Sequence, residues 1–318
     1  MEKEIPILYI VVPCFNEQEV LPQSHERLSQ LVNAMINQGI IAHESKLLYV
    51  DDGSRDDTWQ VIGGLAGESS QVAGVKLACN SGHQNALMAG LAAAVEHCDI
   101  TVSIDADLQD DINVIPQMVE HYRNGCDIVF GVRRQRKSDT WFKRTTAAMF
   151  YKLMNRLGVD TINNHADFRL MSRRSVLALL DYKERNLFIR GIVTKLGYKT
   201  HCVYYDRTAR TAGESKYPVW KMANLAVDGI TSFSVKPVRM VFMVGILFLM
   251  IALIMLVYVL TAYLMGRAVS GWPSLILSVW LVGAFILIGL GIIGEYVGKI
   301  YTEVKNRPRY NVDTTIGL

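Results

Sequence analysis

The sequence predicts an α/β domain with a mostly parallel sheet, followed by a two-helix transmembrane hairpin. Two observations lead to this fold class. Short apolar runs alternate with helix-like segments from Ile7 to Val132, which is the pattern of a parallel sheet covered by helices on both faces. Further along the chain, residues 240–266 and 268–294 contain no Asp, Glu, Lys or Arg.

Five apolar runs are short enough to be strands that are buried on both faces. They are ILYIVV (Ile7–Val12), KLLYVD (Lys46–Asp51), VAGVKLA (Val72–Ala78), ITVSID (Ile100–Asp105) and DIVFGV (Asp127–Val132). Helix-like segments lie between them at 17–37, 56–68, 83–97 and 112–124. Because ligands of such sheets bind beyond the carboxyl ends of the strands, the residues that follow each strand are the candidates for chemistry.

Composition limits the classes of function. The 318 residues include 33 Lys+Arg and 30 Asp+Glu, a balance that argues against nucleic acid as a partner. The five cysteines show no CxxC spacing, so we expect reduced thiols of a cytosolic domain rather than disulfides or a zinc site. The N-terminal run MEKEIPILYIVVPCFNE lacks a small-residue cleavage site and is interpreted as a first strand, not a signal peptide.

Two transmembrane helices are predicted within 238–298, at about 240–265 and 272–295. A bilayer core of about 30 Å needs roughly 20 helical residues, and both uncharged stretches exceed that length. The alternative is a buried helical hairpin in a soluble core. The motif GLGIIG (Gly289–Gly294) matches G-x-G-x-x-G, but inside a span it indicates close helix packing rather than a nucleotide site.

Flanking charge predicts the orientation of this hairpin. The connecting loop holds only Arg267, whereas the two outer flanks carry Lys236, Arg239, Lys299, Lys305, Arg307 and Arg309. We therefore expect a multi-pass protein of the inner (cytoplasmic) membrane, with the domain 1–216 and the tail 299–318 both cytoplasmic. Residues 217–237 mix apolar and charged side chains and are predicted to be an amphipathic segment in the membrane interface, with a plain surface helix as the alternative.

Polar and acidic residues follow four of the predicted strands. The segments are PCFNE (13–17), VDDGS (50–54), CNSGHQNA (79–86) and DADLQDD (105–111). Any one of them alone is compatible with a turn or a helix cap. Because the carboxyl ends of parallel strands meet at one edge of a sheet, the four together predict a polar site there.

The segment DADLQDD predicts a metal site. Residues i and i+2 of an extended chain face the same way, so Asp105 and Asp107 point together, with Gln109 along the same edge. Carboxylate and amide oxygens are hard ligands that suit Mg²⁺ or Mn²⁺ carrying substrate phosphates. A solvated loop is the alternative for this pattern. Asp110 and Asp111 are predicted to cap the following helix.

Two basic segments supply cations for phosphate groups. GVRRQRK follows the fifth strand and includes Arg133, while DRTARTAGESKY includes Arg207, Arg210 and Lys216 and lies shortly before the first span. Basic side chains close to a membrane are placed to meet a phosphate or an anionic lipid headgroup. For GVRRQRK the alternative is an ordinary solvated loop.

Taken together, the motifs resemble those of the family 2 glycosyltransferases of GT-A fold. They resemble more closely the polyprenyl-phosphate glycosyltransferases, the group of bactoprenol glucosyltransferases and dolichol-phosphate mannose synthase. The matching segments span nearly the whole chain and are VVPCFNE, VDDGS, NSGHQNAL, DADLQD, ADFRLM (Ala166–Met171), RTAGESKY and GEYVGKIYTEVKNRPRY. The family often has Gly where Ala166 stands, a small departure. Processive relatives carry Q-x-x-R-W, and no Trp here follows an Arg, so polymer synthesis is disfavoured.

The resemblance implies a role for each matching residue. The nucleotide-sugar pocket would be lined by Pro13, Phe15, Glu17, Asp52, Asp105 and Ala106. The metal ion, Mg²⁺ or Mn²⁺, would be bound at Asp105, Asp107 and Gln109, and the catalytic carboxylates would be Asp167 and Asp105. The phosphate groups, including that of the lipid, would be bound by Arg133, Arg144, Arg169, Arg207, Arg210 and Lys216.

The expected function is one inverting displacement. A sugar would move from a nucleotide sugar, UDP-glucose or another UDP-hexose, to undecaprenyl phosphate at the membrane. The second pKa of a phosphate monoester is roughly 6, so the acceptor is largely ionised and needs little help from a general base. Asp167 would then position the acceptor or stabilise the transition state, and an ion pair with Arg169 is the alternative.

Three other functions stay open at this stage. They are a dolichol-phosphate mannose synthase-like transfer from GDP-mannose, a nucleotidyltransferase, and a non-catalytic membrane scaffold or translocator with a degenerate transferase domain. A nucleotidyltransferase activity would not explain the two predicted membrane spans. The intact acidic residues at the strand ends argue against a non-catalytic scaffold. The resemblance also makes a homo-oligomer an expectation.

Overall fold

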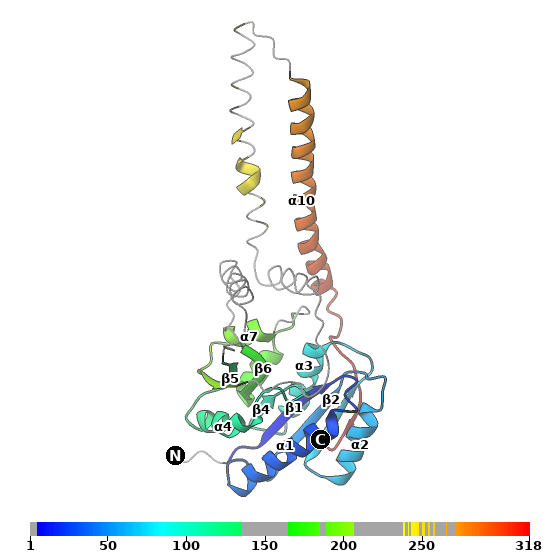
Figure 1. The fold of residues 1–318 in the computed structure, drawn as a ribbon, viewed down its shortest axis with the longest axis vertical. Helices are drawn as coiled ribbons and strands as arrows, with labels where there is room; N and C mark the ends of the chain where they lie inside the picture. Colours follow the sequence, from blue (N-terminus) through cyan, green and yellow to red (C-terminus); the bar gives the residue numbers. More distant parts are fainter. Residues whose placement is uncertain are drawn as a thin grey trace. The chain divides into compact units, whose positions relative to one another are not determined.

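The computed structural model describes residues 5–134, 165–184, 189–206 and 271–318, together with individual residues between 238 and 265. The chain divides into two compact units. The first contains the sheet and the C-terminal residues Arg307–Leu318, and the second contains the long helix α10 (Trp272–Val304) (Figure 1). Outside the described residues lie the predicted interfacial segment 217–237 and four predicted phosphate-binding residues, Arg144, Arg207, Arg210 and Lys216.

Among the described residues, the first unit is built on one eight-stranded sheet with the order β7-β5-β6-β4-β1-β2-β3-β8. The strands are β1 (Leu8–Cys14), β2 (Lys46–Asp51), β3 (Val72–Leu77), β4 (Ile100–Ser103), β5 (Ile128–Arg133), β6 (His165–Ser172), β7 (Thr200–Tyr205) and β8 (Val312–Ile316). Neighbouring strands run parallel except where β6 or β8 takes part. The prediction of a mostly parallel sheet is confirmed, and the five predicted strands are present.

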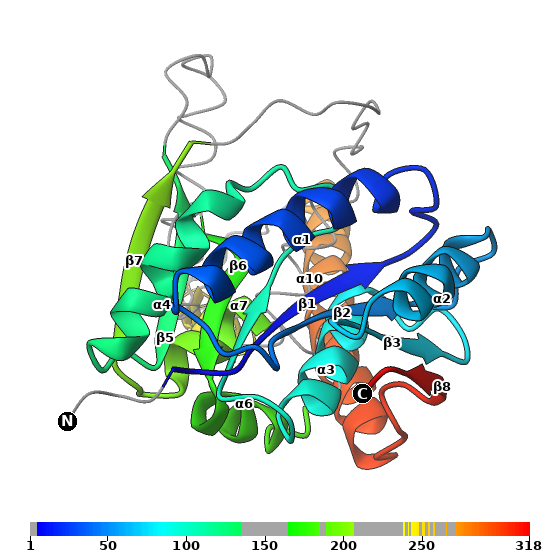
Figure 2. The ribbon, with the colours of Figure 1, turned by 90° about the horizontal axis from the view of Figure 1, so that it is seen from below.

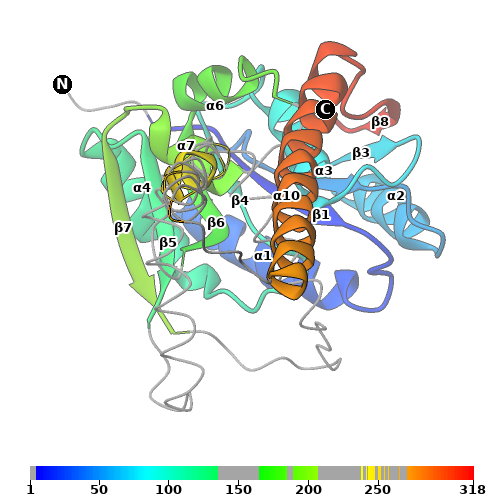
Figure 3. The ribbon, with the colours of Figure 1, turned by 90° about the horizontal axis from the view of Figure 1, so that it is seen from above.

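Helices cover both faces of this sheet (Figures 2 and 3). One face carries α1 (Leu21–Asn37), α2 (Thr58–Glu68) and α4 (Ile115–Arg123), and the other carries α3 (His83–Ala94) and α6 (Arg173–Leu180). The 3-10 helix η1 (Ile112–Val114) precedes α4, and α7 (Ile189–Lys195) follows α6. The four predicted helical segments are confirmed. Helix α1 begins at Leu21 rather than at residue 17, with Pro22 in its first turn, where proline is well tolerated.

Alternation along the strands divides the core between the two faces. Leu8, Ile10 and Val12 of β1 belong to the buried cluster that also holds the inner residues of α1 and α4. Val11 faces the opposite side, where a Cβ atom on Gly90 of α3 would lie 2.4 Å from its Cγ1. Glycine at position 90 therefore allows α3 to pack closely on β1.

Strand β6 runs antiparallel between β4 and β5 and is the main departure from a simple parallel sheet. Its Arg169 is paired with Ser103 of β4, and the Ser103 hydroxyl donates to the carbonyl oxygen of Asp167 at 2.7 Å. Because β4 leads directly into Asp105, this insertion brings Asp167 to the same edge as the acidic segment, although the two are far apart in the chain.

The C-terminal residues form β8, a strand that the sequence analysis did not predict. β8 pairs antiparallel with β3 and covers that edge of the sheet. The Lys46 ammonium donates to the carbonyl oxygen of Gly317 at 2.5 Å, and the Arg309 guanidinium donates to that of Tyr182. The chain that follows α10 is therefore an integral part of the first unit and not a loose tail.

Within the described residues, one helix is long and apolar enough to cross a membrane. Its candidate span is Phe285–Val304 in α10, and 6% of this stretch is buried, unlike the core helix of a soluble protein. α10 continues to Val304, past residue 295 where the span was predicted to end. The charged residues beyond that point do not interrupt the backbone hydrogen bonds that hold a helix together. Of the predicted first span, residues 241, 243–247, 250, 251, 254 and 257 are helical. The rest of that span lies outside the described residues, so the hairpin stays a prediction.

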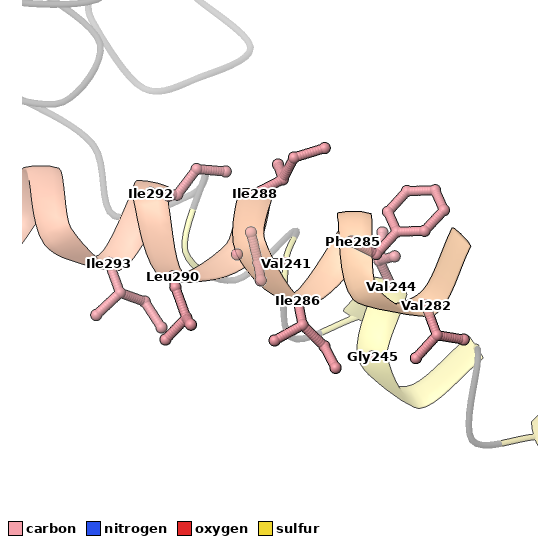
Figure 4. A pocket seen from close by; sticks show the side chains of 11 residues that line it. Val241, Val244, Gly245, Val282, Phe285, Ile286, Ile288, Leu290, Ile292 and Ile293 are labelled. Carbon is pink, nitrogen blue, oxygen red and sulfur yellow. The ribbon is translucent and has the colours of Figure 1, made fainter. Parts of the chain in front are cut away.

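An apolar hollow of about 560 Å³ lies in the second unit (Figure 4). It is lined by α10 residues such as Phe285 and Ile286, and by Val241, Val244 and Gly245 of the predicted first span. A Cβ atom on Gly289 would lie 3.1 Å from Cγ1 of Val241. Gly289 therefore lies close to Val241, but nothing lies within 4 Å of a Cβ atom at Gly291 or Gly294, so the packing interpretation of GLGIIG is supported at Gly289 alone.

The close packing of α3 on β1 predicts the effect of a methyl group at position 90. In Gly90→Ala the new Cβ would contact Val11 and Val50 at 2.4 and 2.6 Å, so we expect a loss of about 2 kcal/mol in the free energy of unfolding. The matched control is Gly64→Ala in α2, where no atom lies within 4 Å of the new Cβ and alanine should stabilise the helix by about 0.5–1 kcal/mol. Thermal melting of both variants in detergent tests this, and equal melting temperatures would contradict it.

Candidate active site

The loops after β1 and β2 are joined by hydrogen bonds between backbone and side chains. Asn16 has φ 54°, donates its N–H to Ser54 Oγ at 2.9 Å, and accepts at Oδ1 from the N–H of Arg55 at 2.9 Å. The N–H of Glu17 donates to Thr58 Oγ1 at 2.9 Å. These bonds hold PCFNE and VDDGS together as one edge, as the sequence analysis predicted.

Asp52 connects this edge to the start of α3. Its carboxylate is buried and accepts from the N–H groups of Ser81 at 2.7 Å and Gly82 at 2.9 Å. Burial raises the pKa of Asp52 above its ordinary value, and these two hydrogen bonds oppose that rise only in part. At Gly53, φ is +65° and a Cβ atom would lie 2.6 Å from the backbone carbonyl carbon of Cys79, so only glycine fits this turn.

The other residues predicted for the nucleotide-sugar pocket lie along the same edge. Pro13 and Ala106 are buried, whereas Phe15 exposes 42% of its surface. Ser24 of α1 donates its hydroxyl to the carbonyl oxygen of Ala106 at 2.6 Å, which anchors the chain between Asp105 and Asp107. The structure places all of these residues near the ends of β1, β2 and β4. Their contact with a nucleotide stays a prediction.

The acidic pair Asp105 and Asp107 follows β4. Burial and the neighbouring carboxylate of Asp167 raise the pKa of Asp105, while His83 opposes the rise, with its Nε2 at 3.6 Å from Asp105 Oδ1. The side-chain amide of Gln109 donates to the carboxylate of Asp107. Gln109 therefore orients Asp107 in this structure, and its predicted role as a metal ligand stays a prediction.

Asp167 lies between two arginines. Its Oδ1 accepts from Arg169 Nη2 at 2.6 Å, and Arg190 of α7 makes a two-pronged contact, with Nε at 3.0 Å from Oδ1 and Nη2 at 2.8 Å from Oδ2. Burial by itself would raise the pKa of Asp167, but the hydrogen bonds and positive charges of Arg190 and Arg169 hold it well below the ordinary value. Nε2 of His83 lies 3.8 Å from Oδ2. Asp167 is therefore ionised at neutral pH.

Two sequence-based interpretations are corrected by these contacts. Arg169, predicted to bind phosphate, exposes only 1% of its surface and pairs with Asp167, which was the stated alternative. Asp110, predicted to cap a helix, is instead buried and accepts from Arg133 at 2.8 Å and 3.1 Å. Only Asp111 caps the following turn, where it accepts from the N–H of Asn113 at 3.0 Å.

Two residues of the site escaped the sequence analysis. His83 stands within CNSGHQNA, but nothing in that segment singled it out as a neighbour of both Asp105 and Asp167. Arg190 follows Asp167 by 23 residues and belongs to no motif that we identified. The position of α7, whose first N–H donates to Gln84 Oε1 at 3.3 Å, brings Arg190 to the site.

The donor set suits a hard divalent cation. Among the described residues, no group of three or more His, Cys, Asp or Glu side chains is arranged to hold a metal ion by itself. Asp105 and Asp107 nevertheless provide two carboxylates at a partly exposed strand end, with 41% of the Asp105 side chain accessible. Mg²⁺ and similar ions are commonly held by one or two carboxylates and complete their coordination with substrate phosphates and water. The residues therefore fit a metal ion that binds together with a phosphorylated substrate.

Comparison with known proteins places this geometry in context. Residues 9–180 match the family described as Glycosyl transferase family 2. The chain is 50% identical to the uncharacterized glycosyltransferase YkoT of Bacillus subtilis, over 98% of this chain and 93% of that protein. It is 40% identical to the SfII prophage-derived bactoprenol glucosyl transferase of Shigella flexneri, over 95% of this chain and 96% of that protein. Among solved structures, glucosyl-3-phosphoglycerate synthase of Mycobacterium tuberculosis with Mn²⁺ and UDP-glucose has a TM-score of 0.45 and 19% identity, over 71% of this chain and 78% of that one.

The ion pair between Asp110 and Arg133 should stabilise the fold, whereas the neighbouring pair between Arg134 and Asp206 should contribute little. Arg133→Gln leaves the buried Asp110 carboxylate without its partner, and we expect a loss of about 3 kcal/mol in the free energy of unfolding. Arg134→Gln is the matched control, because Arg134 and Asp206 are both exposed and 3.6 Å apart, and its effect should stay below about 0.5 kcal/mol. Thermal melting of the two variants makes the comparison, and equal losses would refute a structural role for Arg133.

Proposed function

The chain belongs to glycosyl transferase family 2, and from this premise we propose that it transfers glucose from UDP-glucose to undecaprenyl phosphate. The observation that carries the proposal is the 40% identity to a bactoprenol glucosyl transferase over 95% of this chain. Bactoprenol is another word for undecaprenol. An oxygen of the lipid phosphate would bond to the anomeric carbon of glucose while the bond from that carbon to UDP breaks, which inverts the configuration at that carbon.

A divalent cation, Mg²⁺ or Mn²⁺, would be held by Asp105 and Asp107, with Gln109 beside them. Such an ion neutralises the charge that develops on a departing diphosphate. Ser24 and Gln109 serve this site indirectly, because Ser24 anchors the chain at Ala106 and Gln109 orients the carboxylate of Asp107. The partial exposure of Asp105 leaves room for the phosphates of a substrate.

The nucleotide of the donor would lie over the ends of β1 and β2. Pro13, Phe15, Glu17 and Asp52 border this place, and the exposed ring of Phe15 offers an apolar surface for a base or ribose. Asp52 has both carboxylate oxygens engaged by Ser81 and Gly82, so it would shape the pocket through the loop that it holds.

Asp167 would act as a positioning group and not as a general base. Its pKa lies well below the ordinary value, so it takes up a proton poorly at neutral pH. A base is also unnecessary, because a lipid phosphate with a second pKa of roughly 6 is already largely ionised. The carboxylate instead holds the guanidinium groups of Arg169 and Arg190 in fixed orientations.

The membrane helix would keep the protein at the membrane, where the lipid acceptor is found. α10 carries the candidate span, and the hairpin with a cytoplasmic domain and cytoplasmic termini remains part of the proposal. The basic residues Arg144, Arg207, Arg210 and Lys216, which lie outside the described residues, would bind phosphate groups near the membrane surface. A homo-oligomer is likewise proposed from the family resemblance alone.

The direct test is incubation of the purified full chain with undecaprenyl phosphate and labelled nucleotide sugars, with and without EDTA. We expect lipid-linked glucose from UDP-glucose, and little or no product from UDP-N-acetylglucosamine or GDP-mannose. EDTA should abolish transfer, and excess Mg²⁺ or Mn²⁺ should restore it. No lipid-linked sugar from any donor would refute the proposed activity, a preference for GDP-mannose would refute the donor, and full activity in EDTA would refute the metal.

The positioning role of Asp167 predicts a turnover effect. Asp167→Asn removes the charge that aligns Arg190, so turnover at saturating substrates should fall about 100-fold, the scale of a misplaced reacting group. The remaining activity should show no new dependence on pH between 6 and 8, because no proton is taken up at this position. The matched control is Asp127→Asn, which breaks the Arg174 pair and should lower stability without such a loss of turnover. Near-normal turnover of Asp167→Asn would exclude the role.

A further inference from the structure

We propose that Arg190 binds the phosphate of the lipid acceptor through the part of its guanidinium group that Asp167 does not occupy. The inference rests on the proposed function and adds to it a residue that binds the acceptor. Arg190 stands outside the predicted basic segments. Its place in the site is known only from the packing of α7.

The geometry of Arg190 leaves hydrogen-bond donors available. A guanidinium group has five N–H donors in a planar fork, and Asp167 takes two of them, at Nε and Nη2. The Arg190 side chain is 43% exposed, so the other donors can be reached from outside the protein. The contact with Asp167 fixes the plane of the group before any ligand arrives, which favours two-pronged binding of a phosphate.

The charged groups around Asp167 favour the binding of an anion. One carboxylate lies between two guanidinium groups, which leaves one positive charge in excess once Asp105 and Asp107 are assigned to the metal ion. Arg169 cannot meet a ligand, because it is 1% exposed and its Nε and Nη1 are buried. Of these two arginines, Arg190 is therefore the one that can bind an anionic substrate and so balance the excess positive charge.

The strand order separates Arg190 from the predicted nucleotide pocket. β1 and β2 carry the nucleotide edge, β4 carries Asp105, and β6 with Asp167 lies beyond β4 on the opposite side. A donor whose base lies over β1 and β2 and whose diphosphate reaches Asp105 would present its sugar toward Asp167 and Arg190. The phosphate expected on that side is the attacking phosphate of the acceptor and not the diphosphate of the donor.

The test compares Arg190→Gln and Arg190→Lys with the matched control Arg174→Gln. Arg174 makes the same two-pronged contact with a buried carboxylate, that of Asp127, at 2.5 Å and 2.5 Å. Asp127 directly precedes β5 and Ser172 at the end of β6 donates to it, so this pair lies at the opposite end of β6 from Asp167. Arg174→Gln therefore reports the cost of losing an arginine–aspartate pair away from the site.

For Arg190→Gln we expect the KM for undecaprenyl phosphate to rise about 10- to 100-fold, as for the loss of a hydrogen bond between charged groups. The KM for UDP-glucose should change less than about threefold. Arg190→Lys keeps the charge and should recover part of the acceptor affinity. Arg174→Gln should leave both KM values unchanged.

Other results would overturn the inference. A rise in the KM for UDP-glucose instead would assign Arg190 to the donor diphosphate, and a loss of turnover with both KM values unchanged would leave it as a support for Asp167 only. If Arg190→Gln does not fold, the same comparison is made with Arg190→Lys, for which an unchanged acceptor KM would overturn the inference.

Calorimetry separates this inference from the proposed function. Farnesyl phosphate is titrated into the full-length wild type and the Arg190 variants, with farnesol as the probe that lacks a phosphate. Weaker binding of farnesyl phosphate alone by the variants supports the inference even if the wild type transfers no sugar. Equal binding by wild type and variants would overturn it even if the wild type transfers glucose.

Discussion

The carboxylate of Asp167 is shared by two guanidinium groups, and much of the site depends on this arrangement. Arg169 comes from the same strand and is fully buried, whereas Arg190 comes from α7 and is partly exposed. A buried arginine without a counter-charge would be strongly unfavourable, so Asp167 must stay ionised and in place. The ion pair between Asp167 and Arg190 connects α7 to β6 and fixes the orientation of the Arg190 guanidinium group at the edge of the site. Asp167 therefore holds both guanidinium groups in fixed orientations.

The same physical rule separates the acidic residues at this edge into two groups. Asp52 and Asp110 are buried, and each accepts hydrogen bonds from another segment of the fold. They join neighbouring segments and have little capacity left for a ligand. Asp105 and Asp107 are more exposed, with 41% of the Asp105 side chain accessible, so a ligand can still reach these two carboxylates. Asp52 and Asp110 therefore connect parts of the fold, whereas Asp105 and Asp107 remain accessible to a ligand.

The C-terminal strand β8 lies outside residues 9–180, the part of the chain that matches the family. After the candidate membrane helix the chain returns to the sheet and pairs with β3, and Arg309 reaches the carbonyl oxygen of Tyr182 shortly before α7. Asn311 accepts from the N–H of Ala78 at 2.9 Å, directly before the segment that holds Asp52 and carries His83. The residues that follow the membrane helix thus contact the chain just before the segment of His83 and at the turn that follows α6.

The sequence by itself determined the features that depend on local pattern. Alternating apolar runs indicated the five central strands and the four helices between them, and the uncharged stretches indicated a membrane segment. The polar strand ends located the site because parallel strands finish at a common edge. Tertiary structure alone decided that Asp110 pairs with Arg133, that Arg190 joins Arg169 at Asp167, and that β8 pairs with β3. The reason is that periodicity reports the environment of a residue along its own element, whereas the partner of a buried charge is set by contacts between segments far apart in the chain.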